Sequence, residues 1–118
     1  MDKTTVVEIS GLGEFIIKNE LTIGEELQID VRRATLSNGM YGQMIESPNA
    51  VEFSAGWRLF RMVELDGRIE TYPKDWDGCS SISRDQLDDL WKEWTEKSGK
   101  FLKQAEEPDG TKKPGEES

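Results

Sequence analysis

The chain of 118 residues has no histidine and only one cysteine, Cys79. Without an imidazole group it cannot build a Ser-His-Asp or Cys-His catalytic set, a histidine metal site or a histidine pH switch. A single thiol forms neither an internal disulfide nor a cysteine-rich zinc site, which favours a reducing compartment. We therefore expect no enzyme activity, no cofactor and no metal, and we expect Cys79 to be a small, partly buried side chain.

Long apolar runs are also missing. No stretch approaches the roughly 20 residues that cross a bilayer, and the polar start of the chain is unlike a signal peptide. Both features predict a soluble, intracellular protein that does not bind a membrane. The 24 acidic and 15 basic residues give a net charge of −9. This charge repels nucleic-acid phosphates and anionic lipid, so a protein partner is favoured.

Strongly apolar residues are scarce as well. Leu, Ile, Val and Phe make up only about a fifth of the chain, close to the limit below which chains stay disordered. The four Trp, four Phe and two Tyr residues favour one folded domain with a modest core, over residues 1–104. Residues 105–118 hold no apolar side chain after Ala105 and predict a disordered acidic tail.

The N-terminal third has the pattern of β-strands. Apolar residues on both sides of the glycine-rich turn at 10–13 predict a hairpin over residues 7–18. A further strand is expected at residues 27–32, where apolar and polar side chains alternate. That strand would direct three side chains toward a core: Leu27, Ile29 and Val31.

The middle segment supports two interpretations. Apolar residues recur at helical spacing from Asn49 to Leu65, after a proline that can start a helix. The Asp66-Gly67 pair, in contrast, lies between apolar flanks and is typical of a hairpin turn over residues 49–72. These residues alone leave helix and hairpin open.

The C-terminal part predicts a loop over residues 73–81 and then an amphipathic helix. Ser83 and Gln86 have the spacing of a capping box. The apolar residues that follow share one helical face, and that face has two interpretations. It packs on the N-terminal sheet as core, or it forms a partly exposed, Trp-rich groove for a partner, because Trp is enriched at binding hot spots. The candidate partner-binding residues are Leu87, Leu90, Trp91, Trp94 and Phe101.

Two short motifs suggest ligand sites but do not fit them. Gly11-Leu12-Gly13 begins like a dinucleotide fingerprint, yet Ile16 stands at the third glycine position. Asp75-Trp76-Asp77-Gly78 is similar to part of a calcium loop, yet Arg84 stands where that loop needs a glutamate. We expect Trp76 to fill the core and the aspartates to shape the turn.

The order of these features resembles tail assembly chaperones of long-tailed bacteriophages, over about residues 5–102. The segments that carry the resemblance are the hairpin, Leu21-Thr22-Ile23-Gly24-Glu25-Glu26-Leu27, Arg32-Arg33, Asn38-Gly39-Met40-Tyr41-Gly42, Tyr72-Pro73-Lys74-Asp75-Trp76 and the acidic Leu-Trp helix. The resemblance favours a helix in the middle segment. We accordingly predict an α+β fold, in which two C-terminal helices pack on a small N-terminal antiparallel sheet.

The resemblance implies a chaperone that coats the tape measure protein, helps to recruit tail tube subunits, works in the host cytoplasm and is absent from the mature virion. Self-association is a further expectation. Two other functions are open: an acidic mimic of DNA that inhibits a host nuclease or CRISPR effector, and a small head–tail structural protein of the virion. Acids spread evenly along the chain count against the mimic.

Overall fold

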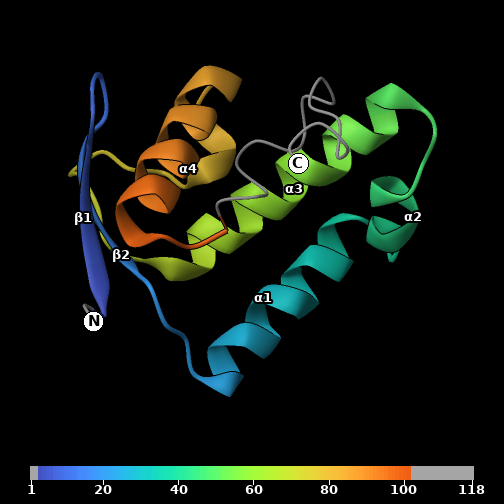
Figure 1. Cartoon of the computed structure of the whole chain (residues 1–118), viewed down its shortest axis with the longest axis horizontal. Coiled ribbons are helices and arrows are strands. Elements are labelled where there is room, and N and C mark those ends of the chain that lie inside the picture. The colour runs from blue at the N-terminus through green and yellow to red at the C-terminus, as the bar shows by residue number, and fades with distance from the viewer. Residues whose placement is uncertain (1–2, 102–118) are drawn as a thin grey trace, which may run out of the picture.

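The computed structural model describes residues 3–101, which form an α+β fold with a three-stranded antiparallel sheet and helices on both sides of a long central helix (Figure 1). The predicted fold class is confirmed, and the tail predicted at 105–118 lies outside the described residues. The elements in chain order are β1 (Thr4–Ile9), β2 (Gly13–Lys18), α1 (Ile23–Leu36), α2 (Tyr41–Ile45), α3 (Ala50–Arg68), β3 (Ile69–Thr71), the 3₁₀ turn η1 (Cys79–Ser81) and α4 (Arg84–Ser98).

The predicted hairpin is present as β1 and β2, which pair from Thr4 opposite Lys18 to Ile9 opposite Gly13. Gly13 has a φ of 127°, and a Cβ at this position would lie 2.9 Å from Cγ of Pro73. Glycine is therefore required here both by the backbone and by the neighbouring loop. The third strand is β3, which pairs with β2 and gives the sheet order β1-β2-β3.

The strand predicted at residues 27–32 is wrong, because this segment lies within helix α1. The Thr22 side chain accepts a hydrogen bond from the Glu25 N–H, and the Glu25 carboxylate accepts one from the Thr22 N–H. This capping box starts a helix just before the alternating residues. Residues two positions apart point in nearly opposite directions in a helix. Ile29 therefore lies on the inner face of α1, while Leu27 and Val31 point into solvent.

The middle segment is a helix, α3, and it runs through the Asp66-Gly67 pair instead of turning there. The Asn49 side chain caps its start by accepting hydrogen bonds from the N–H groups of Val51 and Glu52. Gly67 serves helix packing, because a Cβ at this position would overlap with the Ile29 side chain and lie 2.6 Å from its Cδ1. The continuous helix thus excludes the hairpin interpretation, and Gly67 allows the close contact between α1 and α3.

The core lies between the sheet, α4 and the C-terminal half of α3. Helix α4 begins at the predicted capping box of Ser83 and Gln86 and ends at Gly99, whose φ is 79°. In Figure 1, α4 and the sheet lie on one side of α3, and α1 lies on the other. The buried cluster comprises Val7, Ile9, Phe15, Ile17, Leu65, Cys79, Leu87, Leu90, Trp91 and Trp94.

Candidate functional site

The structure places the predicted partner-binding residues of α4 inside the molecule. Leu87, Leu90, Trp91 and Trp94 are between 0% and 5% exposed, and Phe101 is half-buried beside them. Of the two interpretations of this face, the packed one describes the fold. Leu87 also lines a surface pocket of about 320 Å³, together with Met62 and Ile82. The role of the five residues in binding a partner stays a prediction.

Polar contacts hold Trp94 in the core. Its Nε1 donates a hydrogen bond of 3.0 Å to Oδ1 of Asn19, and the guanidinium carbon of Arg68 lies 5.1 Å from its ring centroid. Trp91 contacts Trp94, Phe60 and Phe101 with ring centroids 5.5–5.8 Å apart. These aromatic contacts tie α4 to α3 and give the small core much of its buried area.

The exposed apolar side chains gather elsewhere, in the segment from residue 23 to residue 51. Six of the eight large apolar side chains that are exposed in the described part of the chain belong to this segment. They are Ile23, Leu27, Val31, Leu36, Met40 and Val51. Single exposed apolar residues are ordinary, but a contiguous group of them marks an interaction surface.

Three of these residues form one stripe along α1, which we call the outer α1 face: Ile23, Leu27 and Val31. They are 75%, 58% and 63% exposed, and their spacing of four residues stacks them on successive turns. This face was not predicted from the sequence, because a strand at 27–32 would have pointed Leu27 and Val31 into the core. The missed signal was the Thr22/Glu25 capping box, which predicts a helix instead.

The inner face of α1 is fastened to α3 by buried charges. Arg33 lies 3.5 Å from the Glu64 carboxylate, and the Nε of Arg68 donates a hydrogen bond of 2.9 Å to the same carboxylate. Arg68 also donates hydrogen bonds of 3.0 Å to the carbonyl oxygens of Lys18 and Asn19. One carboxylate thus joins α1, α3 and the end of β2, and buried charges require such partners.

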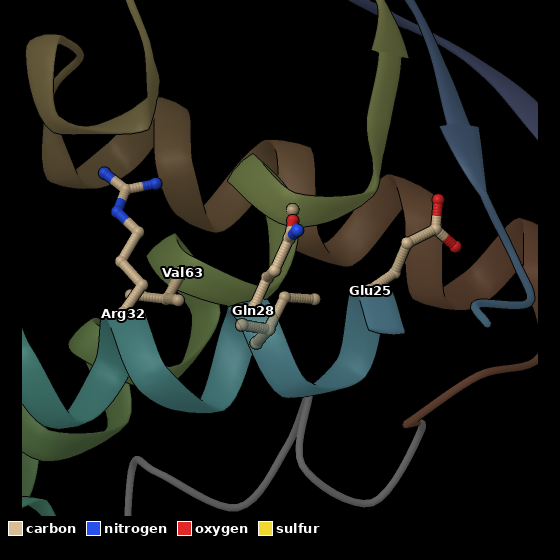
Figure 2. Close-up of a pocket in the computed structure, with 6 residues that line it drawn as sticks. Glu25, Gln28, Arg32 and Val63 are labelled. Atoms are coloured by element: carbon tan, nitrogen blue, oxygen red, sulfur yellow. The ribbon is translucent and has the colours of Figure 1, made fainter. Parts of the chain in front are cut away.

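A pocket of about 260 Å³ lies between α1 and α3, next to this network (Figure 2). In Figure 2, Glu25 and Arg32 stand at its two ends and Gln28 lies between them, all from α1. Both charged groups are already engaged: Lys18 donates a hydrogen bond of 2.6 Å to Glu25, and Arg32 pairs with Asp66 at 3.1 Å. The bond from Lys18 is the main cause that lowers the pKa of Glu25, so this carboxylate stays ionised and is a poor general acid.

The cysteine lies in the core, and the described part of the chain holds no metal-binding cluster. Cys79 is 3% exposed, and burial, followed by the charge of Asp66, raises the pKa of its thiol. A thiol with a raised pKa carries little of the thiolate form that reacts as a nucleophile. Among residues 3–101, no group of three or more His, Cys, Asp and Glu side chains could hold a metal ion.

The loop that contains the calcium-like motif is anchored by Trp76. Its ring packs edge-on against Phe15 at 4.9 Å, while Asp75 and Asp77 are exposed. This arrangement confirms that Trp76 packs against the core, whereas the role of the aspartates in shaping the turn stays a prediction. None of the described helices is long and apolar enough to cross a bilayer.

Comparison with known proteins returned no match: no family model, no curated protein and no solved structure is similar to this chain.

Proposed function

We propose that this chain is a non-enzymatic tail assembly chaperone of a long-tailed bacteriophage, which binds the tape measure protein, keeps it soluble and helps to bring tail tube subunits to it. The observation that supports this proposal is the group of exposed apolar side chains at residues 23–51, outside the main core. The assignment to this family comes from the sequence resemblance. The resemblance implies that the protein works in the host cytoplasm and is absent from the mature virion.

The surface has the two properties that such a chaperone needs. Apolar side chains bind the apolar segments of a client, since burial of apolar surface drives most protein association. A net charge of −9 keeps the resulting complex dispersed by mutual repulsion. Several carboxylates pair with Arg or Lys within the fold, at Glu25, Asp30, Glu64 and Asp66. That pairing disfavours a DNA mimic, which needs free acids to meet a cationic site.

Co-expression with a tape measure protein tests the proposal. The natural source of that client is the gene beside the one for this chain, and an unrelated acidic domain of similar size serves as the control. We expect the client to move from the insoluble to the soluble fraction only with this chain. The client and this chain should then elute together in size-exclusion chromatography. A client that is equally soluble with the control domain would refute the proposal.

A further inference from the structure

We propose that the outer α1 face docks one amphipathic, cationic helix of a partner protein, whose apolar side chains cover Ile23, Leu27 and Val31 and whose Lys or Arg side chains lie over Glu26 and Asp30. This inference rests on the proposed function and assigns its binding surface. The partner-binding surface is thus assigned to α1, whereas the sequence pattern had suggested α4.

The shape of the face selects a helix. Ile23 and Val31 are eight residues apart, which corresponds to a stripe about 12 Å long. The exposed Ala34 continues the stripe by almost one more turn, and its small side chain allows close approach. An apolar stripe of this spacing is complementary to the i, i+4, i+8 anchors of a partner helix.

The stripe cannot be covered by a movement of α1 itself. The opposite side of the helix holds Ile29 against Gly67 and Arg33 beside Glu64. Rolling the outer face inward would separate this buried pair and expose the apolar Ile29. The outer face is therefore presented to solvent by the same contacts that hold the fold together.

The rest of the given chain offers little to cover the stripe. Outside the described residues, the sequence comprises residues 1–2 and 102–118. Its only apolar side chains are Met1, Leu102 and Ala105. These residues do not supply three apolar anchors at helical spacing.

Charge decides which molecule fits. Glu26 and Asp30 border one side of the stripe; both are exposed, and Glu26 forms no ion pair with any described residue. Arg33, which lies on the inner face of α1, pairs with Asp30, but the Asp30 side chain remains 63% exposed. The other base of α1, Arg32, is turned toward Asp66 on α3. Neither base of α1 therefore adjoins the stripe on its outer side, and a partner with Lys or Arg there gains complementary contacts.

A second copy of this chain fits less well. In an antiparallel pair of α1 helices, the acidic border of one copy faces the acidic border of the other, and like charges across an interface are unfavourable. Each copy also carries a net charge of −9. Self-association through this face is thus the competing arrangement that the experiment must distinguish.

Fluorescence anisotropy with the full chain tests the proposal. The probe is a fluorescein-labelled 18-residue helical peptide with Leu at three successive i, i+4 positions and Lys beside them, and a second peptide carries Glu in place of Lys. We expect the full chain to bind the Lys peptide more tightly. Leu27→Asp should weaken this binding at least about tenfold, which corresponds to 1.4 kcal/mol. Glu26→Lys should reduce the preference for the Lys peptide.

Val6→Asp is the matched control, because Val6 is 50% exposed but lies in strand β1, on the other side of α3 from α1 (Figure 1). We expect it to bind the Lys peptide as the wild type does. Equal losses in Leu27→Asp and Val6→Asp, or equal binding of the two peptides, would overturn the proposal. Light scattering adds one more refuting result, a wild-type dimer that Leu27→Asp converts to a monomer. Circular dichroism shows whether each variant is folded, and Leu27→Ser replaces Leu27→Asp if that variant is not.

The same variants separate this inference from the proposed function. If Leu27→Asp still solubilises the tape measure protein as well as the wild type does, the surface is misassigned while the function stands. If the wild type binds the Lys peptide but does not solubilise the client, the surface is right and the proposed function is wrong.

Discussion

Helices α1 and α4 have nearly the same length and the same kind of start, but they use their apolar residues in opposite ways. Each begins at a capping box, Thr22 with Glu25 in α1 and Ser83 with Gln86 in α4. All four large apolar side chains of α4 are buried, whereas α1 buries only Ile29 of its five. Similar local chemistry therefore builds a core helix in one half of the molecule and a surface helix in the other.

The difference comes from what each helix packs against. Helix α4 lies against β1 and α3, which together cover its apolar face (Figure 1). Helix α1 contacts α3 along one side only, at Ile29 and through the pairs of Arg33 with Glu64 and Arg32 with Asp66. A helix held on one side by charges and one apolar contact leaves its other face available for a partner.

The largest expected effect is from the same substitution made in both helices. Leu90→Ala in α4 removes a side chain that is 0% exposed and leaves a cavity, which should lower the free energy of unfolding by about 3 kcal/mol. Leu27→Ala in α1, at 58% exposure, should change it by less than about 0.5 kcal/mol. Urea unfolding followed by Trp fluorescence measures both. Equal losses would contradict the contrast between the helices.

Glu64→Gln tests the charged connection between α1 and α3. The residue is 6% exposed, and the neutral side chain would leave Arg33 and Arg68 without their common carboxylate. Removing one partner of a buried ion pair typically costs about 3 kcal/mol. Glu26→Gln, on the exposed side of α1, is the control and should be nearly neutral. If Glu64→Gln and Glu26→Gln unfold at the same midpoint, the network contributes little to stability.

Gly67→Ala tests the close approach of α1 and α3, with a smaller expected effect. The new Cβ would overlap with Ile29, which should cost about 2 kcal/mol, although Ala favours a helix by about 1 kcal/mol over Gly. The net loss should thus be about 1 kcal/mol. The double variant Gly67→Ala/Ile29→Ala should lose less stability than the sum of the two single variants. Additive losses in thermal unfolding would argue against this contact.

The smallest effect concerns the pH dependence of the exposed pair at the start of α1. The hydrogen bond from Lys18, followed by the backbone N–H of Thr22, lowers the pKa of Glu25 below its ordinary value of 4.5. Glu25 therefore adds stability above about pH 4.5, and this contribution is lost as the pH falls through the lower pKa of the folded state. Lys18→Met should make the urea midpoint less dependent on pH in this range, while Lys3→Met should not. An unchanged pH profile in Lys18→Met would show that the pair has no influence.

Much of the fold could be predicted from local patterns. The hairpin at 7–18 and the Ser83/Gln86 capping box each depend on residues close together in the sequence. The helix from Asn49 was predicted with the help of the resemblance, and it extends to Arg68. The candidate site was not found, because the period-2 pattern of Leu27, Ile29 and Val31 was given more weight than the capping box that precedes it.

Neighbouring residues specify the hairpin turn at 10–13 and the Ser83/Gln86 capping box, and composition specifies the lack of histidine and the net charge of −9. These are properties of single residues and near neighbours, so no tertiary contact is needed to establish them. Tertiary packing places Trp91 and Trp94 in the core and leaves Leu27 and Val31 at the surface. Burial depends on which distant element covers a face, and here Gly67 admits Ile29 and Glu64 holds Arg33, so that α1 turns its other side to solvent.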